Sequence, residues 1–334
     1  FIILLYLIAL FAEFVEPYDP AEFSRLSDFV PPQTIRFVHD GEFVGPFVYE
    51  LERTRDLETA RVSYMENKEI VHKIHFFTRG YEYTWLGIIT TDLHLFGLGG
   101  DTDQRFFIAG SDNLGRDLLS RLIYGARISL SVGLLGVFFS FILGIIIGGI
   151  SGYYGGWVDN IIQRLIEFLR SIPTIPLWMG LAAALPVEWP PMRVYFLITI
   201  ILSIIGWTGL ARVVRGRFLS MRDEDFILAA RFAGARERRI IFRHMLPSFT
   251  SHIIASLTLA IPNMILGETS LSFLGLGLRP PVVSWGVLLQ SAQNLSTVAL
   301  APWLLLPGAA IVVTILAFNF LGDGLRDAAD PYAR

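Results

Sequence analysis

The sequence predicts an all-helical protein that crosses a membrane several times. Hydrophobic residues fill 53% of its 334 positions, and its mean hydropathy is +0.54, which is too apolar for an ordinary soluble protein. Most of the apolar stretches approach the roughly 20 residues that a helix needs to cross a bilayer. Barrel strands would instead alternate polar and apolar residues. The stretches lie near 128–150, 172–186, 194–211, 253–276 and 302–322.

The chain opens with another apolar segment, Phe1 to Ala12. As a helix it would cover only about 18 Å, and it has neither an initiating Met nor a basic flank. No small-residue cleavage site follows, which argues against a signal peptide. We therefore expect residues 1–16 to be transmembrane helix 1, incomplete at its N-terminus. Six transmembrane helices with both chain ends on one side is the simplest topology.

Charge asymmetry predicts the orientation of the chain in the membrane. Between Ala211 and Pro247 nine arginines stand against four acids, whereas about fifteen acidic and nine basic residues lie between Pro17 and Gly110. Short loops rich in Arg stay in the cytoplasm, and long loops need not obey this rule. We therefore predict a cytoplasmic loop 212–247 and a cytoplasmic tail 323–334. The region 17–110 is then extracytoplasmic.

The extracytoplasmic region is expected to contain β-strands. Asp40-Gly41 stands between two alternating segments, which indicates a hairpin. The run Ile70 to Phe77 reads as a further strand, with a turn at Arg79-Gly80. Its histidines, His72 and His75, are interpreted as strand residues rather than zinc ligands, because no neighbouring ligands have suitable spacing. This insert is either a contact surface for a partner or a segment packed on the outer face.

Residues 111–127 are predicted to form an amphipathic helix at the membrane interface, and residues 128–322 are predicted to form the transmembrane core. In that core three glycines recur every fourth residue, a spacing that allows close helix packing in lipid. A later pair, Arg164 and Glu167, is interpreted as a structural ion pair. The apolar positions of the interfacial helix are Leu114, Leu118, Leu119, Leu122 and Ile123, and the glycines are Gly144, Gly148 and Gly152.

Several chemistries have no support in the sequence. The only lysines, Lys68 and Lys73, lie in the outer region, so the chain has no P-loop. It has no cysteine, which excludes disulfides and thiolate metal sites. Asp101-Thr-Asp103 begins like a calcium loop, but Phe106 stands where that loop requires Gly. We therefore predict no metal site, no bound cofactor and no catalytic residue.

The arginine-rich loop carries a pattern suited to docking. A helix should start near Asp225, where the acids favour its positive end, and Gly234 can cap it. A second helix is expected over Glu237 to Met245, stopping at Pro247. Two short helices meeting at a glycine would form a compact knob that a partner can approach closely. The alternative is an amphipathic connector on anionic lipid. One face of the first helix would carry a stripe of Phe226, Ala229, Ala230 and Ala233.

This loop resembles the "EAA" coupling loop of ABC-importer permeases, Glu-Ala-Ala-x3-Gly-x9-Ile-x-Leu-Pro. The chain departs from that pattern at Leu228, where the family has Glu, and at His244, where it has Ile. The resemblance implies that the loop couples to ATPase subunits. The residues that would do so are Asp225, Ala229, Ala230, Gly234, Leu246 and Pro247.

Further segments resemble the second ("C-type") permease subunit of the dipeptide/oligopeptide transporter family, and they extend over nearly everything after Gly110. The region from about Phe29 to Gly100 has no counterpart in that resemblance. The matching segments are Gly110-Ser-Asp-Asn-Leu-Gly-Arg-Asp117, Tyr124-Gly-Ala-Arg-Ile-Ser-Leu130, Leu271-Ser-Phe-Leu-Gly-Leu-Gly277, Pro280-Pro281, Ser284-Trp-Gly286 and Asn319-Phe-Leu-Gly-Asp-Gly-Leu-Arg-Asp-Ala-Ala-Asp-Pro331.

The resemblance implies the permease subunit of an importer in the bacterial cytoplasmic (inner) membrane. It implies a second homologous permease subunit, two cytoplasmic ATPase subunits that bind ATP and Mg, and an external solute-binding protein that delivers peptides. Oligosaccharides, opines or nickel are alternative substrates within related permeases. An ion-coupled secondary transporter and a receptor-like membrane anchor are the alternatives outside them.

Glu268 is the clearest candidate for a residue of the translocation pathway. A carboxylate at membrane depth is costly and should face a cavity or a partner. It either takes part in the pore or its gate, or accepts hydrogen bonds as a buried structural group. A Trp in the external loop Arg279 to Gly286 is expected at interface level. The other pathway candidates are Asn263, Ser270 and Trp285.

Overall fold

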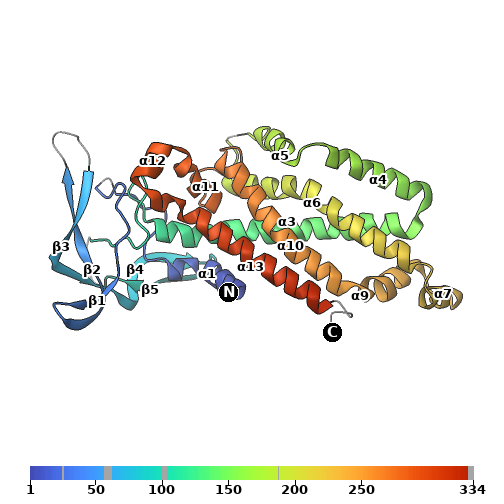
Figure 1. The fold of residues 1–334 in the computed structure, drawn as a ribbon, viewed down its shortest axis with the longest axis horizontal. Coiled ribbons are helices and arrows are strands. Elements are labelled where there is room, and N and C mark those ends of the chain that lie inside the picture. Colours follow the sequence, from blue (N-terminus) through green and yellow to red (C-terminus); the bar gives the residue numbers. More distant parts are fainter. Residues whose placement is uncertain (25, 56–61, 100–103, 187, 330–334) are drawn as a thin grey trace. The chain divides into compact units, whose positions relative to one another are not determined.

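The computed structural model describes residues 1–24, 26–55, 62–99, 104–186 and 188–329 (Figure 1). Asp101-Thr-Asp103, which begins like a calcium loop, lies outside the described residues, as do the last residues of the C-terminal motif. The chain divides into two compact units. Each unit joins segments that are far apart in the sequence. The first contains Phe1–Ser129 and Arg279–Ala310, and the second contains Leu130–Leu278 and Ile311–Arg334.

The predicted β-strands are present in the first unit. Three strands form an antiparallel sheet in the order β1-β2-β3, and β4 and β5 form a separate antiparallel pair. The strands are β1 (Arg36–His39), β2 (Glu42–Arg55), β3 (Val62–Lys73), β4 (His75–Trp85) and β5 (Ile89–Gly97). Both His72 and His75 belong to strands, as predicted.

The first predicted turn is confirmed and the second is misplaced. His39 pairs with Glu42, and Asp40 and Gly41 between them have φ of 50° and 86°. Two positive φ angles match the right-handed twist of the strands. In contrast, Arg79-Gly80 is no turn: it lies inside β4 at a register shift. The chain reverses later, at 86–88, between Trp85 and Ile89, which pair with each other.

The first unit also contains short helices and the start of a long one. The helix α3 (Leu118–Tyr154) is continuous, so the separate amphipathic helix predicted at 111–127 does not form. Residues 111–117 make a tight loop, with a bridge between Ser111 and Asp117. The short helices are α1 (Ile2–Leu10), α2 (Ala12–Val15), α11 (Trp285–Gln290) and α12 (Leu295–Leu300).

Within the described residues, four helical segments are long and apolar enough to cross a membrane. They are α3, α6 (Pro191–Met221), α10 (Thr250–Phe273) and the stretch Pro302–Ala328, which contains most of α13 (Leu306–Ala329). The predicted apolar stretch near 172–186 forms α5 (Thr174–Ala183), and α4 (Gly156–Ser171) precedes it. The break falls at Ile172, which is extended because Pro173 follows it.

The glycine stripe of α3 packs against α6 in the second unit, as its spacing predicted. A Cβ added at Gly144 would lie 2.9 Å from Leu210, and one at Gly148 would lie 2.4 Å from the carbonyl oxygen of Ala211. At Gly152 the nearest atom belongs to Phe218, at 2.6 Å. Larger side chains would therefore separate the two helices, which is the reason for small residues at such contacts.

Candidate functional site

The first part of the predicted loop, 212–221, continues α6, and residues 222–249 form a short helical elbow between α6 and α10. The helix α7 (Asp225–Phe232) begins at the predicted acidic cluster. The chain then forms α8 (Glu237–Arg239), a π-helix over Ile240–Met245 and α9 (Leu246–Ser248). The predicted second helix is thus largely a π-helix. Pro247 does not stop it, because proline is tolerated in the first turn of the short helix that follows.

Gly234 ends α7 in a left-handed conformation, as predicted, with φ of +76°. Its N–H donates to the Arg231 carbonyl at 2.9 Å, and the N–H of Ala235 donates to the Ala230 carbonyl at 3.0 Å. This pair of bonds is a Schellman motif, which satisfies carbonyls at a helix end. Nothing lies within 4 Å of a Cβ added at Gly234. Its backbone conformation, and not local crowding, is therefore what requires glycine here.

Buried apolar side chains hold the elbow on the second unit. Ile227 of α7 has an exposed fraction of 0%, and it packs in one cluster with Phe218 of α6. Ile240 and Met245 from the π-helix join the same cluster. Burying side chains of this size contributes about 1.5–3 kcal/mol each. The elbow is therefore a packed structure joined to the long helices, and a displacement of α7 would be transmitted to α6.

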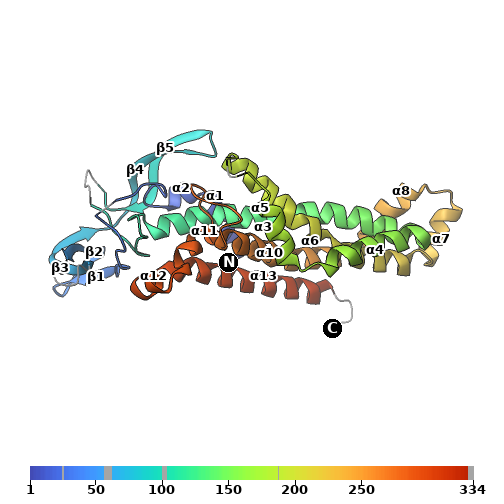
Figure 2. The same ribbon diagram turned by 90° about the horizontal axis from the view of Figure 1, so that it is seen from above.

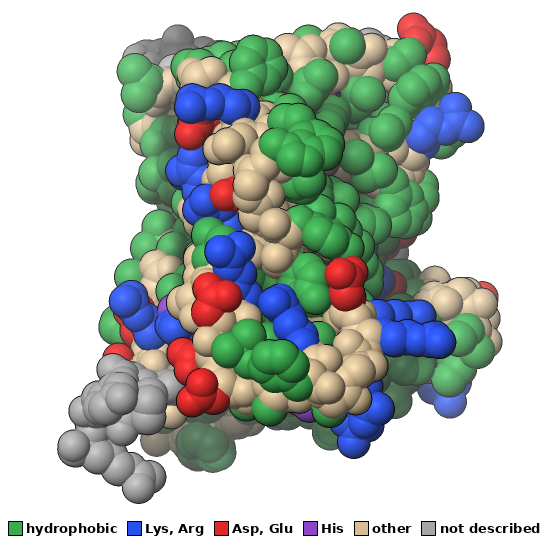
Figure 3. Space-filling model, turned by 90° about the vertical axis from the view of Figure 1, so that its right-hand side faces the viewer, with side chains coloured by type: hydrophobic (Ala, Val, Ile, Leu, Met, Phe, Trp, Pro, Cys, Tyr) green, Lys and Arg blue, Asp and Glu red, His purple; other side chains and the backbone are tan. Residues whose placement is uncertain are grey.

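The opposite face of the elbow is exposed. Phe226 is 46% exposed, Phe232 90% and Phe242 61%. Of the six residues predicted to couple to an ATPase, Asp225, Ala229, Gly234 and Pro247 are exposed, whereas Ala230 and Leu246 are half-buried against the apolar cluster. Basic and acidic side chains lie around apolar ones on the face that carries α7 (Figure 3).

A polar network among α3, α4 and α6 was not predicted from the sequence. The Nε and Nη2 atoms of Arg215 on α6 each donate to an Asp159 carboxylate oxygen at 2.5 Å. Ser151, near the end of α3, donates to the same carboxylate at 2.5 Å, so three helices are joined at one point. The pair that the sequence did predict, Arg164 with Glu167, forms at 2.8 Å but is largely exposed. Residue spacing can identify a pair within one helix only.

Glu268 is completely buried near the end of α10. The hydroxyl of Ser272 donates to its Oε1 at 2.8 Å, and the backbone N–H of Leu278 donates to that hydroxyl at 3.0 Å. The carboxylate therefore supports the turn that leaves α10.

The other pathway candidates differ in burial and in the unit to which they belong. Asn263 is on the same helix but exposed, and Ser270 is half-buried. Trp285 belongs to the other unit and is only 2% exposed. Its indole N–H donates to the Leu122 carbonyl at 3.0 Å, so it is a packed residue rather than one free at an interface. The external loop predicted here ends at Trp285, where α11 begins.

The tight loop at 111–117 is organised by Asp112, which is 1% exposed. Its carboxylate accepts from the backbone N–H groups of Leu114 and Arg116 at 2.8 and 3.1 Å. It also pairs with the side chains of Arg116 and Arg121. A buried carboxylate needs such donors to offset its desolvation. The segment that resembles the permease family is thus a structural clamp at the start of α3.

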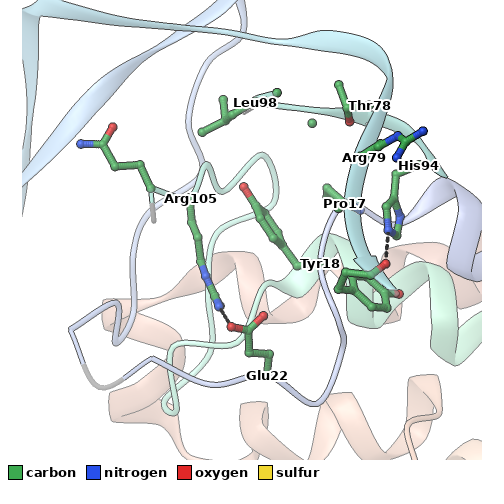
Figure 4. A pocket seen from close by; sticks show the side chains of 13 residues that line it. Pro17, Tyr18, Glu22, Thr78, Arg79, His94, Leu98 and Arg105 are labelled. Atoms are coloured by element: carbon green, nitrogen blue, oxygen red, sulfur yellow. Dashed lines mark hydrogen bonds and ion pairs between the residues drawn. The ribbon is translucent and has the colours of Figure 1, made fainter. Parts of the chain in front are cut away.

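A polar pocket of about 270 Å³ lies among the strands and the segment after α2 (Figure 4). Arg105 pairs with Glu22 there and lies over the Tyr18 ring, with 5.5 Å from its guanidinium carbon to the ring centroid. Both ring nitrogens of His94 face carbonyl oxygens, Nδ1 at 2.8 Å from Glu16 and Nε2 at 3.0 Å from Tyr81. These contacts are internal, and they stabilise the unit.

The family model for the inner membrane component of binding-protein-dependent transport systems matches residues 141–334. The chain belongs to this family. Its members are transport permeases of the inner membrane, and the matched region includes the elbow, the Asp159–Arg215 pair and Glu268. The apolar helices agree with that location.

Curated relatives extend the similarity. The dipeptide transport system permease protein DppC of Bacillus subtilis is 41% identical over 67% of this chain and 68% of its own. The oligopeptide transport system permease protein OppC of Haemophilus influenzae is 41% identical over 70% and 73% of the two chains, respectively. OppC of Bacillus subtilis is 37% identical over 67% and 72%. The chain is therefore similar to peptide permeases across most of their length.

Proposed function

We propose that this chain is a permease subunit of an ATP-driven peptide importer, forming half of the translocation pore. The names of its relatives support peptides, either dipeptides or oligopeptides, as the substrate. An external solute-binding protein would deliver the peptide. A second homologous permease would complete the pore, and two cytoplasmic subunits would bind ATP and Mg and hydrolyse the ATP. The six-helix topology, with both ends cytoplasmic and an extracytoplasmic β-containing insert, is part of this proposal.

The packed elbow is the observation that carries the mechanism. Its exposed face includes Ala229 and Phe232, and Ile227 on the other face is buried in the core. An ATPase that docks on the exposed face could therefore displace α7 as a rigid piece. Because Ile227 packs with Phe218, the displacement would pass to α6 and from there to the pore. In an alternating-access cycle this step converts closure of the ATPases into a change of the side to which the pore opens.

The coupling role is tested with Gly234 variants in proteoliposomes that contain the complete transporter. We expect Gly234→Val to lower ATP-dependent uptake strongly, because a β-branched residue at positive φ disrupts the helix cap at a cost of about 1–2 kcal/mol. Gly234→Asn tolerates this conformation and adds bulk to the exposed face. Loss of uptake in both variants would therefore indicate contact with a partner, and loss in Val alone would indicate the cap.

Gly156 provides the matched control. It also has a positive φ, +56°, and nothing lies within 4 Å of an added Cβ, but it lies outside the elbow. We expect Gly156→Val to keep the ATPase rate coupled to uptake. Normal, ATP-driven uptake by Gly234→Val would contradict the coupling role. Uptake that is driven by an ion gradient without ATP would contradict the proposal that the protein belongs to an ATP-driven importer.

A further inference from the structure

The hairpin of β4 and β5 ends in an uncharged apolar tip. From Tyr83 to Thr91 the sequence contains no charged residue. Leu86 is 50% exposed, Ile88 78% and Ile89 53%. The charged side chains of the two strands lie further from the tip. An exposed apolar cluster of this kind is unfavourable in water and marks a contact with another apolar phase.

The tip lies beside α1, whose surface is also apolar. An apolar groove of about 680 Å³ runs between the helical segment and the hairpin, and the two are side by side in Figure 2. The rings of Phe11 and Trp85 stack with centroids 5.1 Å apart, which holds the hairpin against the helix. The groove is lined mainly by Leu4, Leu7, Phe11, Trp85, Ile89 and Leu93.

The Leu10 carbonyl oxygen, at the end of α1, accepts from both the hairpin and α3. The Leu10 carbonyl accepts from the Trp85 indole N–H at 3.0 Å and from Arg127 Nη2 at 3.1 Å. Arg127 also pairs with Glu13. Trp and Arg are the residues that anchor a protein at the boundary between lipid and water. Arg127 directly precedes the longest apolar part of α3, so the boundary on the two helical segments coincides.

We propose that the β4–β5 hairpin dips its tip, residues 85–89, into the membrane beside α1, and that lipid acyl chains occupy the apolar groove. The polar contacts of Glu16 with Tyr81 and His94 lie before the boundary. The tip lies beyond it. The apolar surface of α1 continues onto the tip without a charged residue, and this continuity argues for lipid as the occupant, with α1 as part of the proposed first transmembrane helix.

The strands limit the depth of insertion. A two-stranded sheet has outer edges with backbone groups that need water or another partner. The hairpin can therefore enter only the region of headgroups and upper acyl chains, about 5–10 Å deep. Thr84 and Thr90, which flank the tip and contact each other at 3.3 Å, can bond to headgroups at this level.

Single-cysteine labelling tests the proposal, because the chain has no cysteine of its own. Ile88→Cys in the complete transporter is labelled with an environment-sensitive fluorophore and reconstituted in liposomes. Spin-labelled lipid and aqueous iodide serve as the two quenchers. Phe43→Cys is the matched control, since Phe43 is also 78% exposed and lies at the other hairpin, beside the polar Asp40-Gly41 turn.

We expect the label at Ile88 to have blue-shifted emission and to be quenched several-fold more by spin-labelled lipid than the label at Phe43. Aqueous iodide should quench the label at Phe43 more than the label at Ile88. Strong quenching of the Ile88 label by iodide and weak quenching by spin-labelled lipid would place the tip in water and overturn the proposal. Protection of the Ile88 label from both quenchers would also overturn it, because a protein partner would then cover the tip. Neither result depends on the transported substrate.

Discussion

Two residues, Gly234 at the end of α7 and Glu268 near the end of α10, bear on the proposed transport role. Gly234 has the left-handed conformation that its place after a helix predicted, since only local backbone geometry is involved. Glu268 is buried, as a carboxylate within an apolar stretch should be. Its hydrogen-bond partners could not be predicted, because Leu278 meets Ser272 only through the fold of the turn after α10. Trp285 was assigned to an interface and is buried instead.

Two substitutions of Glu268 separate its charge from its hydrogen bond. Glu268→Gln keeps an oxygen that can accept from Ser272, so we expect its free energy of unfolding to change by less than about 1 kcal/mol. Transport, or the ATPase activity stimulated by substrate, should nevertheless fall if the pore needs the charge. Both activities and the unfolding temperature are measured on the purified transporter.

Glu268→Leu is the companion variant. It removes the acceptor, and we expect it to destabilise the chain by about 1–3 kcal/mol because the buried Ser272 hydroxyl loses the group to which it donates. Wild-type transport and wild-type ATPase activity in Glu268→Gln, together with reduced stability in Glu268→Leu, would make Glu268 a purely structural group.

At the scale of elements, apolar length and glycine spacing predicted the helices that pack most tightly. The spacing in α3 identified its contact with α6, because small residues on one face allow close approach. Local sequence did not predict the π-helix at Ile240–Met245, whose register is set by burial of both terminal side chains in the cluster with Phe218. It also did not predict the uninterrupted start of α3.

The contact among α3, α4 and α6 should depend on Arg215. Arg215→Ala would leave the Asp159 carboxylate without its bidentate partner. Removing one partner of a fully buried pair costs about 3–5 kcal/mol. The Arg215 side chain is 30% exposed, so we expect a smaller loss in the free energy of unfolding, on the order of 2–3 kcal/mol.

Arg164→Ala is the control for that measurement. Its pair with Glu167 is exposed, and such pairs contribute about 0–1 kcal/mol. Thermal unfolding of the purified transporter compares the two variants. Equal effects of Arg215→Ala and Arg164→Ala would show that the Asp159 network does not hold the three helices together.

At the scale of the whole molecule, stability depends on buried ionisable groups that unfolding exposes. Burial raises the pKa of the Asp117 carboxyl from 3.8 to about 6. The hydrogen bonds that Ser120 donates to this carboxyl lower its pKa, but by less than burial raises it. The folded chain therefore holds this proton more tightly than the unfolded chain. The resulting stabilisation is complete below about pH 4 and is lost as the pH rises through about 6.

Asp117→Asn removes this titration and keeps an oxygen that can accept from Ser120. We expect the variant to gain stability relative to the wild type as the pH rises from about 4 to about 7, by up to about 3 kcal/mol. Global unfolding of the two proteins is followed across this range. Parallel pH profiles would show that the Asp117 carboxyl does not change its pKa on folding.

Residue patterns were sufficient to predict the class of the molecule, its β-strands, its long apolar helices and the capped elbow. Each depends on composition, on local backbone geometry or on a short residue period. Tertiary structure alone decided which distant groups meet: Arg215 with Asp159, the burial of Trp285, and the apolar hairpin tip beside α1. These contacts join residues far apart in the chain, and packing and desolvation in the folded protein select them.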